Sequence, residues 1–503
     1  MSKFYLTTAI AYVNAPPHIG HALEFIQADA LARYHRLIGD DTYFLTGTDE
    51  HGVKIYETAQ KEGLETQVMV DKYAANFQEL EGLLNLSNDD FIRTTEDRHK
   101  AGAKKLWEKM AAKGDIYKGK YEGLYCAGCE AFILEKDLDE KGECPNHKKK
   151  PKVLSEENYF FKLSKYSDQV KQAIQSGELV VLPESRKNEI LNIIGDDGLM
   201  DVSFSRPKSA LPWGVEVPGD SDQVMYVWCD ALSNYITAID YAGEGDLWKK
   251  YWPCNAHLIG KDILRFHAGI WIGMLLSAEV KLPKAVYVHG FVTSEGQKMS
   301  KSLGNVVNPL EYVEKYGVDA VRWYLLREIP TTDDGDFSHT RFVDIYNSEL
   351  ANGLGNLVNR VVMMTEKYSE GKVPAVADCE VSEDFERLVG EYKKNFEDFN
   401  IKRACETLSA MINLGNKYID DKKPWSMAKE GDEGLMVVLY NMLEILRYIA
   451  NLLSAILPGT AEKIAAQLGV EADFSADLKW GGMPEGGEVQ KAEVLFKRLL
   501  PEE

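Results

Sequence analysis

The chain has 503 residues, of which 45% are apolar and 27% are charged, a composition typical of soluble globular proteins. This length exceeds a single hydrophobic core and favours two to four structural units. The formal net charge of −21 argues against a protein that coats nucleic acid indiscriminately, because neutralising phosphates requires lysine and arginine. RNA binding through a local basic face remains open.

The amino-terminal sequence predicts a β-α-β unit. Residues 3–12 are rich in β-branched and aromatic side chains and predict a buried strand, with no basic-then-apolar secretion signal before it. Apolar residues recur at spacings of three and four from Leu23 to Leu37, which predicts a helix that ends near Gly39. Residues 42–46 predict a second strand. Such a unit begins a doubly wound parallel sheet, so we expect an α/β, Rossmann-type domain.

The middle of the chain interrupts this pattern. Residues 116–224 contain turns rich in glycine, lysine and cysteine and show little helical periodicity, so we predict an inserted domain. The α/β pattern returns at residues 223–228, followed by a helix through Ile263 and Met274 and by a strand at residues 285–288.

From about residue 340 almost all of the sequence has helical periodicity, with stops at Pro424, Pro458 and Gly459, and predicts an all-α bundle. The most apolar stretch, residues 435–457, carries polar side chains at helical spacing, which indicates an amphipathic helix and not a membrane span. The predicted domains are residues 1–115 and 225–295 (the two halves of the catalytic domain), 116–224 (an insertion with a zinc knuckle), 296–349 (a lysine-rich loop and stem-contact region) and 350–503 (the helical domain).

The cysteines predict a metal site. The chain has seven cysteines, an odd number, and the spacing Cys126-x2-Cys129-x14-Cys144-x2-His147 has paired ligands separated by a loop. Three thiolates and one imidazole suit tetrahedral Zn²⁺ and leave no coordination position for water, so we predict one structural zinc ion. This pattern is typical of a reducing cytoplasm, not of a disulfide framework. Buried free thiols are the alternative.

Histidines near the amino terminus suggest a phosphate site. The segment Pro17-His18-Ile19-Gly20-His21 lies where the first strand's loop enters the predicted helix. Gly20 permits close approach of a ligand to the backbone, and the amides at a helix N-terminus favour phosphate. The imidazoles of His18 and His21 can donate hydrogen bonds to the same oxygens. The alternative is an ordinary histidine pair at a helix cap.

A second segment, Lys298-Met299-Ser300-Lys301-Ser302, lies in a loop with several glycines and serines that follows the predicted strand at residues 285–288. The ammonium groups of Lys298 and Lys301 suit the β- and γ-phosphates of a departing pyrophosphate. Losing such a donor typically costs roughly 3 kcal/mol of transition-state stabilisation. Since a solvated loop is the usual role of such sequences, the prediction depends on both segments meeting around one triphosphate.

These two segments, in this order, resemble the paired signatures of class I aminoacyl-tRNA synthetases. Residues 8–14, 47–52, 226–235 and 259–267 extend the resemblance to the methionyl-tRNA synthetase family over nearly the whole chain. The leucine, isoleucine and valine enzymes carry larger insertions. The cysteine enzyme has a cysteine before its histidine motif, whereas the first cysteine here is Cys126.

The resemblance implies a methionine site in which Asp49 holds the α-ammonium group. The residues implied around methionine are Ile10, Tyr12, Asp49, Trp228, Ala231, Leu232, Tyr235, Ile263 and His267, and those assigned to ATP are Gly20, Gly260, Asp262, His289 and Gly290. Leu232 replaces a proline of some relatives. Aromatic rings suit methionine because its thioether is flexible and polarizable; an ordinary aromatic core is the alternative.

The helical region carries candidates for RNA recognition. Asn356 and Arg360 are four residues apart and therefore share one helix face, and Trp425 follows Pro424. Single-stranded loops are recognised by stacking bases on aromatic rings and by hydrogen bonds to base edges. The resemblance implies that Asn356, Arg360 and Trp425 contact the CAU anticodon; roles in helix packing are the alternative.

We therefore predict a ligase that activates methionine with Mg²⁺-ATP to methionyl-adenylate and transfers it to tRNA(Met), with His18, His21, Lys298 and Lys301 as the catalytic residues. A related class I synthetase, or an adenylyltransferase without a long helical tail, is the first rival. A non-catalytic RNA-binding relative is the second, and the intact histidine and lysine segments argue against it. We expect a monomer, because no β-barrel module of the kind that dimerises longer relatives follows the helical region. From the cysteine pattern and the amphipathic stretch at residues 435–457 we expect a cytoplasmic protein without membrane attachment.

Overall fold

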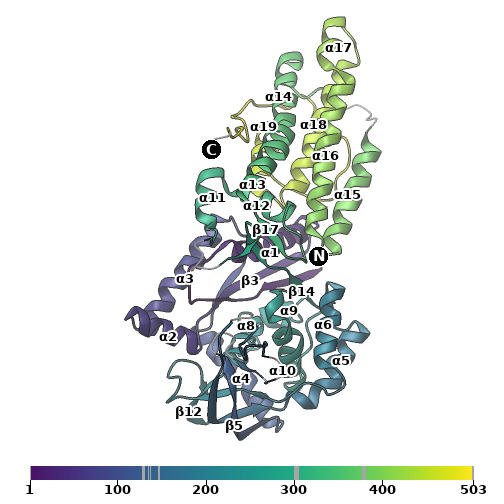
Figure 1. The fold of residues 1–503 in the computed structure, drawn as a ribbon. Coiled ribbons are helices and arrows are strands. Elements are labelled where there is room, and N and C mark those ends of the chain that lie inside the picture. Colours follow the sequence, from purple (N-terminus) through teal and green to yellow (C-terminus); the bar gives the residue numbers. More distant parts are fainter. Residues whose placement is uncertain are drawn as a thin grey trace.

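The computed structural model describes residues 2–126, 131–133, 135, 138–145, 148–299, 305–375 and 381–500. A parallel β-sheet with its helices forms the centre of the molecule, and a helical bundle extends away from it (Figure 1). The parallel sheet and the helical carboxyl-terminal region confirm the predicted α/β class with an all-α bundle.

In the described part of the chain, the large sheet has seven strands in the order β2-β3-β1-β13-β14-β8, with β4 also paired to β3. These strands are β1 (Lys3–Thr8), β2 (Ala11–Tyr12), β3 (Asp41–Asp49), β4 (Asp90–Arg93), β8 (Val180–Leu182), β13 (Ala256–Gly260) and β14 (Ala285–His289). Every pairing in the sheet is parallel, so the carboxyl ends of the strands lie along one edge. The chain order reverses between β1 and β13, which is where open α/β sheets bind their ligands.

The first β-α-β unit agrees closely with the prediction. The strand predicted over residues 3–12 is divided into β1 and β2, and α1 (Ile19–Leu37) matches the predicted helix. The second strand is longer than predicted, because β3 continues to Asp49. The strand at residues 285–288 is β14.

The prediction that the α/β pattern returns at residues 223–228 is wrong. β12 (Asp220–Met225) pairs antiparallel with β10 (Ser205–Pro207) and β11 (Glu216–Val217) in a separate small sheet. The chain after Tyr226 forms the short helix α7 (Val227–Ala231) instead.

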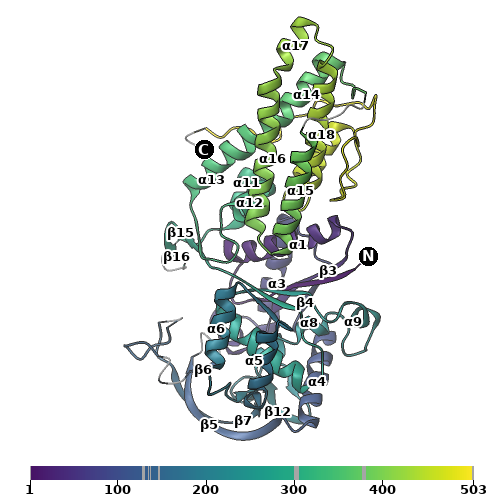
Figure 2. The same cartoon turned by 90° about the vertical axis from the view of Figure 1, so that its right-hand side faces the viewer.

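The inserted region contains more regular structure than its sequence suggested. Its long curved hairpin lies at the end of the molecule away from the bundle (Figure 2). The strands of this four-stranded sheet are β5 (Ile116–Cys126), β6 (Ala131–Ile133), β7 (Lys152–Phe161) and β9 (Val202–Ser203). The expected lack of helical periodicity is wrong, because α5 (Ser167–Ser176) and α6 (Glu184–Ile194) lie in this region. Between them β8 pairs with β14, so residues 116–224 also supply one strand of the large sheet.

Residues in the central strands alternate between two hydrophobic clusters. Phe4 and Leu6 belong to the cluster that includes α1 and the helical bundle, whereas Tyr5 belongs to the cluster on the other face. Leu258 and Ile259 of β13 divide in the same way. Because successive side chains of a strand point to opposite faces, the sheet is buried on both sides.

Helices cover both faces. Those packed around the large sheet are α1, α2 (Val53–Glu62), α3 (Thr66–Leu83), α4 (Asp97–Ala112), α5, α6, α7, α8 (Asn234–Thr237), α9 (Asp246–Tyr251) and α10 (Ile272–Ser277). The predicted helix through Ile263 and Met274 begins with a 3-10 turn, Lys261–Ile263, and a π-helical segment, Phe266–Trp271, and ends as α10.

The bundle consists of long helices whose tip at α17 lies farthest from the sheet (Figure 1). Its elements, with the two helices that lead into it, are α11 (Pro309–Tyr316), α12 (Val318–Arg327), α13 (His339–Ile345), the π-helical segment Tyr346–Gly355, α14 (Asn356–Ser369), α15 (Ser382–Glu397), α16 (Ile401–Lys422), α17 (Pro424–Glu430), α18 (Leu435–Leu453) and α19 (Pro458–Leu468). Pro424 and Pro458 each begin a helix, where the missing amide hydrogen costs nothing.

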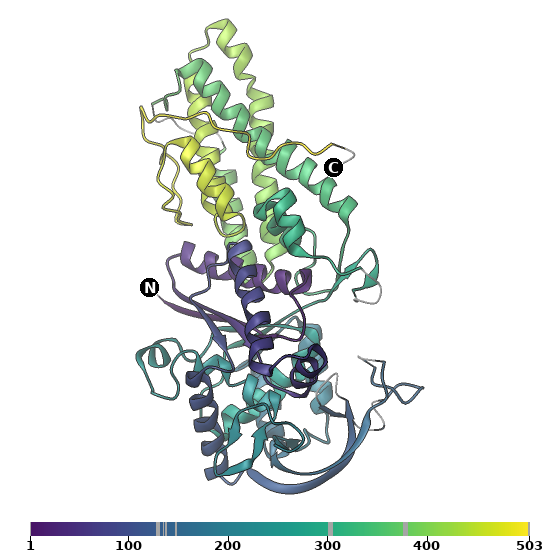
Figure 3. The ribbon, with the colours of Figure 1, turned by 90° about the vertical axis from the view of Figure 1, so that its left-hand side faces the viewer.

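Helix α18 is long and apolar enough to cross a membrane, with a mean hydropathy of 1.4. Most of it, 78% of the apolar window, is buried inside the bundle. This burial agrees with the prediction that the stretch is not a membrane span, although Asn441 and Glu444 of the predicted polar face are themselves buried. Residues 470–500 depart from the predicted helical pattern, because they form an extended segment that runs back along the bundle (Figure 3). The amide of Ala476 there donates a hydrogen bond to the carbonyl of Leu37 at 3.1 Å.

Candidate active site

The predicted histidines form the N-terminal cap of α1. His18 is the N-cap residue, and its Nδ1 accepts a hydrogen bond from the Gly20 amide at 3.1 Å. The amide of His18 donates in turn to Nδ1 of His21 at 3.2 Å, and the two rings stack with centroids 4.0 Å apart. A neutral imidazole that accepts at Nδ1 carries its proton on Nε2. Both side chains therefore present an Nε2–H donor to a ligand.

The environment keeps these histidines neutral. Burial lowers the pKa of His18, although a backbone hydrogen bond opposes the change. Burial, helped by the neighbouring His18 and His289, lowers the pKa of His21 well below its usual value. At pH 7 the two rings therefore act as hydrogen-bond donors and not as cations.

Glu24 connects α1 to the ends of two strands. Its Oε1 accepts a hydrogen bond from the Ala9 amide at 2.8 Å, and its Oε2 lies 3.1 Å from Nε2 of His289. The other nitrogen of His289 lies 2.8 Å from the carbonyl of Gly290, so both ring nitrogens donate, as in an imidazolium. Burial opposes protonation, but the bond to Glu24 outweighs it and raises the pKa of His289. Sequence reasoning missed Glu24, although it lies one helical turn after Gly20.

Two predicted ATP-binding glycines are explained by close packing. A methyl group on Gly260 would lie 3.0 Å from Oδ1 of Asp262 and 3.9 Å from the ring of His289. These three predicted ATP residues therefore lie together at the ends of β13 and β14. A methyl group on Gly290 would approach the carbonyl oxygen of Asp333 to 2.1 Å, so the fold itself requires glycine at this position.

The chain that carries the lysine segment leaves the sheet after β14 and returns to the start of α1. After β14 the chain forms β15 (Val292–Ser294) and β16 (Gln297–Lys298), and it returns at Val307, whose carbonyl accepts a hydrogen bond from the Ile19 amide at 3.1 Å. Lys301 lies outside the described residues. The meeting of lysines and imidazoles around one triphosphate therefore stays a prediction, supported by the attachment of the segment's far end to α1.

The predicted methionine residues come to the same edge of the sheet from separate elements. Tyr12 of β2 pairs with Asp49, the last residue of β3, and Asp49 is buried. Trp228 of α7 stacks on Phe266, with ring centroids 3.8 Å apart. Ala231 and Leu232 follow on α7 and its C-cap, Ile10 lies between β1 and β2, and Tyr235, Ile263 and His267 lie on α8, the 3-10 turn and the π-helical segment.

Tyr235 and His267 form a buried polar contact in this group. Nδ1 of His267 lies 3.0 Å from the carbonyl of Ile263, so this nitrogen donates. Its Nε2 therefore accepts from the hydroxyl of Tyr235, at 2.6 Å. Burial lowers the pKa of His267 to about 4, which keeps the imidazole neutral at pH 7.

This shift predicts a loss of stability in acid. An unfolded histidine titrates near 6.5, so below that pH the unfolded chain binds more protons than the folded chain and the free energy of unfolding falls. Between pH 7.5 and 5, His267 alone should remove about 2 kcal/mol. The free energy of unfolding, measured with urea at both pH values, should fall by about 2 kcal/mol less in His267→Gln than in the wild type. Equal differences in the two proteins would contradict the buried neutral histidine.

Two of the four predicted metal ligands are described. Cys126 ends β5, Cys144 begins a turn in which its carbonyl accepts from the Lys148 amide at 2.8 Å, and both side chains are buried. Cys129 and His147 lie outside the described residues. Within the described ranges, no three His, Cys, Asp or Glu side chains form a metal-binding group.

The predicted anticodon residues lie on the bundle. Arg360 of α14 lies with its guanidinium 5.9 Å from the ring centre of Trp425 on α17, and it also forms an ion pair with Asp420 at 2.6 Å. Trp425 is 38% exposed. Asn356 is exposed on α14 and lines a cavity of about 360 Å³ together with Lys497 and Arg498. Arg360 thus lies against the ring of Trp425, and Asn356 lies on the same helix as Arg360.

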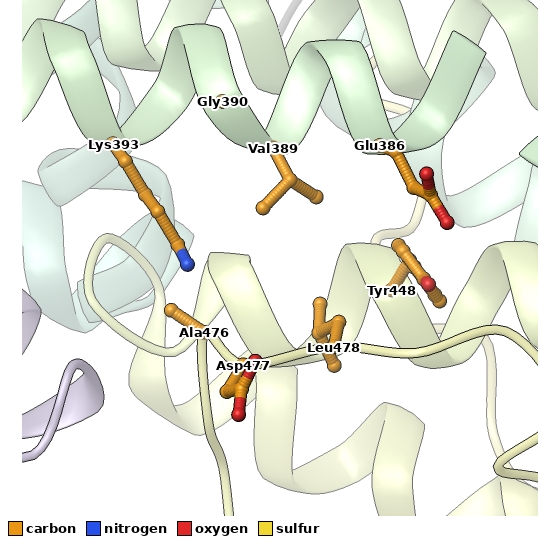
Figure 4. Close-up of a pocket in the computed structure, with 8 residues that line it drawn as sticks. All are labelled: Glu386, Val389, Gly390, Lys393, Tyr448, Ala476, Asp477 and Leu478. Carbon is orange, nitrogen blue, oxygen red and sulfur yellow. The ribbon is translucent and has the colours of Figure 1, made fainter. Parts of the chain in front are cut away.

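A second cavity, of about 230 Å³, lies between α15, α18 and the extended carboxyl-terminal segment (Figure 4). It is lined by Glu386, Val389, Gly390, Lys393, Tyr448, Ala476, Asp477 and Leu478. It lies in the bundle and shares no residue with the sheet edge that carries the histidines.

Known families and structures match the chain along its length. Residues 4–151 and 143–362 match the family described as "tRNA synthetases class I (M)", and residues 369–503 match the "anticodon binding domain of methionyl tRNA ligase". A methionine–tRNA ligase of Fusobacterium nucleatum is 43% identical over 511 residues, covering 99% of this chain and 80% of that protein. A methionine–tRNA ligase of Brucella suis is 41% identical over 508 residues, covering 99% and 98%.

The fold agrees with these sequence matches. Methionyl-tRNA synthetase of Mycobacterium tuberculosis in complex with methionyl-adenylate superimposes with a TM-score of 0.94 at 37% identity, covering 99% of this chain and 100% of that one. Its apo form superimposes with a TM-score of 0.88 at 35% identity, covering 100% of this chain and 99% of that one. The chain therefore belongs to the methionyl-tRNA synthetase family of class I aminoacyl-tRNA synthetases.

Proposed function

We infer that this chain is a methionine–tRNA ligase, which activates methionine with ATP and charges tRNA(Met). The observation that carries this inference is the match to methionine–tRNA ligases over 99% of the chain. The similarity to a solved complex with methionyl-adenylate supports the first reaction, and the match of residues 369–503 to an anticodon-binding domain supports the second.

In the first reaction the methionine carboxylate attacks the α-phosphorus of Mg²⁺-ATP, and the bond to the β-phosphate breaks to release pyrophosphate. We assign the Nε2–H groups of His18 and His21 to the phosphate oxygens on which negative charge develops. The positive end of the α1 helix dipole acts in the same direction. Lys298 and Lys301 neutralise the departing β- and γ-phosphates. Preorganised donors of this kind stabilise a transition state because they need no reorientation during the reaction.

In the second reaction the 2′-hydroxyl of the terminal adenosine attacks the carbonyl carbon of the adenylate, and AMP leaves. No protein side chain forms a covalent intermediate, so positioning and charge stabilisation carry the rate. Methionine is selected by the carboxylate of Asp49 and by the aromatic rings of Tyr12, Trp228 and Tyr235. A difference of one methylene group provides only about 1–3 kcal/mol of discrimination, so the shape of this pocket must be well defined.

Methionine-dependent exchange of labelled pyrophosphate into ATP tests this function. We expect exchange with methionine and a strongly reduced rate with leucine and isoleucine. Exchange with another amino acid in preference to methionine would overturn the assigned specificity.

We assign anticodon recognition to Asn356, Arg360 and Trp425. Stacking of one base on an aromatic ring typically contributes about 1–3 kcal/mol. Trp425→Ala should therefore lower kcat/KM for tRNA by about 10- to 100-fold in aminoacylation and leave pyrophosphate exchange unchanged. Met436→Ala, which removes a similarly exposed apolar side chain from α18, is the control and should change neither rate. Equal effects of the two substitutions would contradict recognition by Trp425.

We also propose that Cys126, Cys129, Cys144 and His147 hold one structural zinc ion. The buried thiols of Cys126 and Cys144 fit this role, because thiolates that leave water need a metal or another charge partner. Purified protein should contain one equivalent of zinc by atomic absorption, and Cys144→Ser should contain less than half of that. The same variant should unfold at a lower temperature. A full zinc content in Cys144→Ser would exclude this ligand set.

The predicted division at residues 115, 224, 295 and 349 is retained as a proposal, with the qualification that β8 completes the large sheet. We also propose a monomer in the cytoplasm. The described thiols of Cys229, Cys254 and Cys405 are buried and form no disulfide, which is compatible with a reducing compartment. Size-exclusion chromatography with light scattering tests the oligomeric state.

A further inference from the structure

A buried carboxylate between two histidines lies behind the predicted methionine site. Asp230 is fully buried on α7. Its Oδ2 lies 2.6 Å from Nδ1 of His51, and its Oδ1 lies 2.8 Å from Nε2 of His99. A carboxylate only accepts hydrogen bonds, so both imidazoles donate to it. Both histidines are buried as well, so solvent does not compete for these bonds.

The cluster of Asp230, His51 and His99 connects elements that carry the predicted methionine residues. His51 follows Asp49 by two positions at the end of β3, and Asp230 lies between Trp228 and Ala231 on α7. The Asp230–His51 bond therefore joins the segment that holds the α-ammonium group to the segment that holds the thioether side chain.

The third member extends this connection to α8, the helix of Tyr235. His99 of α4 has its second ring nitrogen 2.9 Å from Oγ1 of Thr237. Close packing supports the contact, because a methyl group on Gly102 of α4 would lie 2.4 Å from Cγ2 of Thr237. The chain of hydrogen bonds thus runs from β3 through α7 and α4 to α8.

Such a network has a mechanical consequence. Hydrogen bonds to a charged group are shorter and stronger than neutral ones, and burial in a low dielectric strengthens them further. The two imidazoles, with burial opposing them, lower the pKa of Asp230 well below its usual range, so the carboxylate stays charged at every working pH. Movement of α7 away from the end of β3 would take His51, one of its two imidazole donors, from this buried charge, and the cost of that loss keeps both elements in place.

We propose that Asp230, His51 and His99 form a positioning cluster that fixes the distance between Asp49 and the aromatic wall of Trp228 and Tyr235, and thereby sets the selectivity for methionine. The three residues are positioning residues and not catalytic ones. The proposal rests on the proposed function, since it deepens the role of the same site. A fixed distance matters because side chains that differ by one methylene group are separated mainly by the length of the pocket.

Two variants test the cluster in methionine-dependent pyrophosphate exchange. Asp230→Asn keeps the shape but places an amide donor against one imidazole N–H. Thr237→Val removes only the outermost hydrogen bond. His35→Asn is the matched control, because the His35–Asp40 pair, at 2.8 Å, combines the same residue types at the opposite edge of the sheet. Each protein is assayed for KM of methionine, KM of ATP and the ratio of kcat/KM for methionine over ethionine, which is one methylene longer.

We expect Asp230→Asn to raise KM for methionine by about tenfold or more and to lower the methionine-over-ethionine ratio by about tenfold. KM for ATP should change by less than about twofold, since the nucleotide residues lie on other elements. Thr237→Val should change the methionine parameters in the same direction by a smaller factor. His35→Asn should leave all three quantities unchanged even if its unfolding temperature falls.

Two results would overturn the proposal. One is an unchanged methionine KM and selectivity in both variants, or in Thr237→Val alone if Asp230→Asn does not fold. The other is an equal rise of the two KM values, which would indicate a general loss of structure. Failure of the proposed function is distinguishable, because it would appear as a lack of methionine-dependent exchange by the wild-type protein itself.

Discussion

Replacing His21 with asparagine should lower kcat for methionine-dependent pyrophosphate exchange by about 100- to 1,000-fold, while the unfolding temperature changes by about 4 °C or less. The asparagine Oδ1 reaches the position of the imidazole Nδ1 and can accept the hydrogen bond that the His18 amide donates at 3.2 Å. The cap of α1 is therefore kept. What disappears is the Nε2–H donor, whose loss is expected to cost roughly 3–4 kcal/mol of transition-state stabilisation.

His21→Gln is the matched control for this result. The glutamine carboxamide nitrogen reaches the position of Nε2, so this variant keeps a donor and loses the acceptor of the cap. It should retain more exchange activity than His21→Asn and should be less stable. The opposite order of the two activities would show that His21 acts only through the cap.

Lys301→Ala should lose exchange activity while its affinity for methionine barely changes, as expected of a group that contacts the leaving pyrophosphate.

The first unit of the fold was predictable because its signals are local. The spacing of apolar residues along α1 and the histidines at its start lie within twenty residues of one another. β13 was missed because its sequence has only one β-branched residue, Ile259, whereas the equally buried β14 contains two valines and a tyrosine. β8 is only three residues long, and its partner β14 lies about a hundred residues away along the chain.

In the candidate site, too, residues in local motifs could be predicted, whereas residues with partners distant in sequence could not. Its histidines, lysines and aromatic residues could be named from the sequence because they occur in motifs that resemble a known family. Glu24 and Asp230 could not, since an acidic residue on a helix usually faces water. Their roles arise from partners that are distant in sequence, His289 for Glu24 and the pair of His51 and His99 for Asp230. Only the tertiary structure brings these charges together.

Replacing Arg322 with methionine should lower the free energy of unfolding by about 3–5 kcal/mol. Arg322 of α12 has no exposed surface. Its Nη2 lies 2.7 Å from Oδ2 of Asp29 on α1, and its Nε and Nη1 donate to the carbonyls of Ile456 and Leu84 at 2.8 and 3.1 Å. One guanidinium thus joins α1, the helix capped by His18, to the turn before α19 in the bundle.

The expected loss of stability in Arg322→Met is large because the substitution leaves buried polar groups without their partner. Burial opposes the ionisation of Asp29, but Arg322 and Arg33 outweigh it and lower the pKa of this carboxyl. Without Arg322 the buried carboxylate keeps Arg33 and Ser87 as its partners among the described residues, and the carbonyls of Ile456 and Leu84 lose this donor. Methionine fills a similar volume, so a cavity adds little to the loss.

Urea unfolding of four proteins separates the ion pair from simple packing. The wild type, Arg322→Met, Asp29→Asn and the double variant form a cycle in which the double variant should be more stable than the sum of the two losses predicts, by about 1–3 kcal/mol. Arg387→Met, which breaks an exposed pair with Glu391, should change stability by less than about 0.5 kcal/mol. If the two losses simply add, Asp29 and Arg322 are not coupled, and this ion pair does not help to hold α1 against α12.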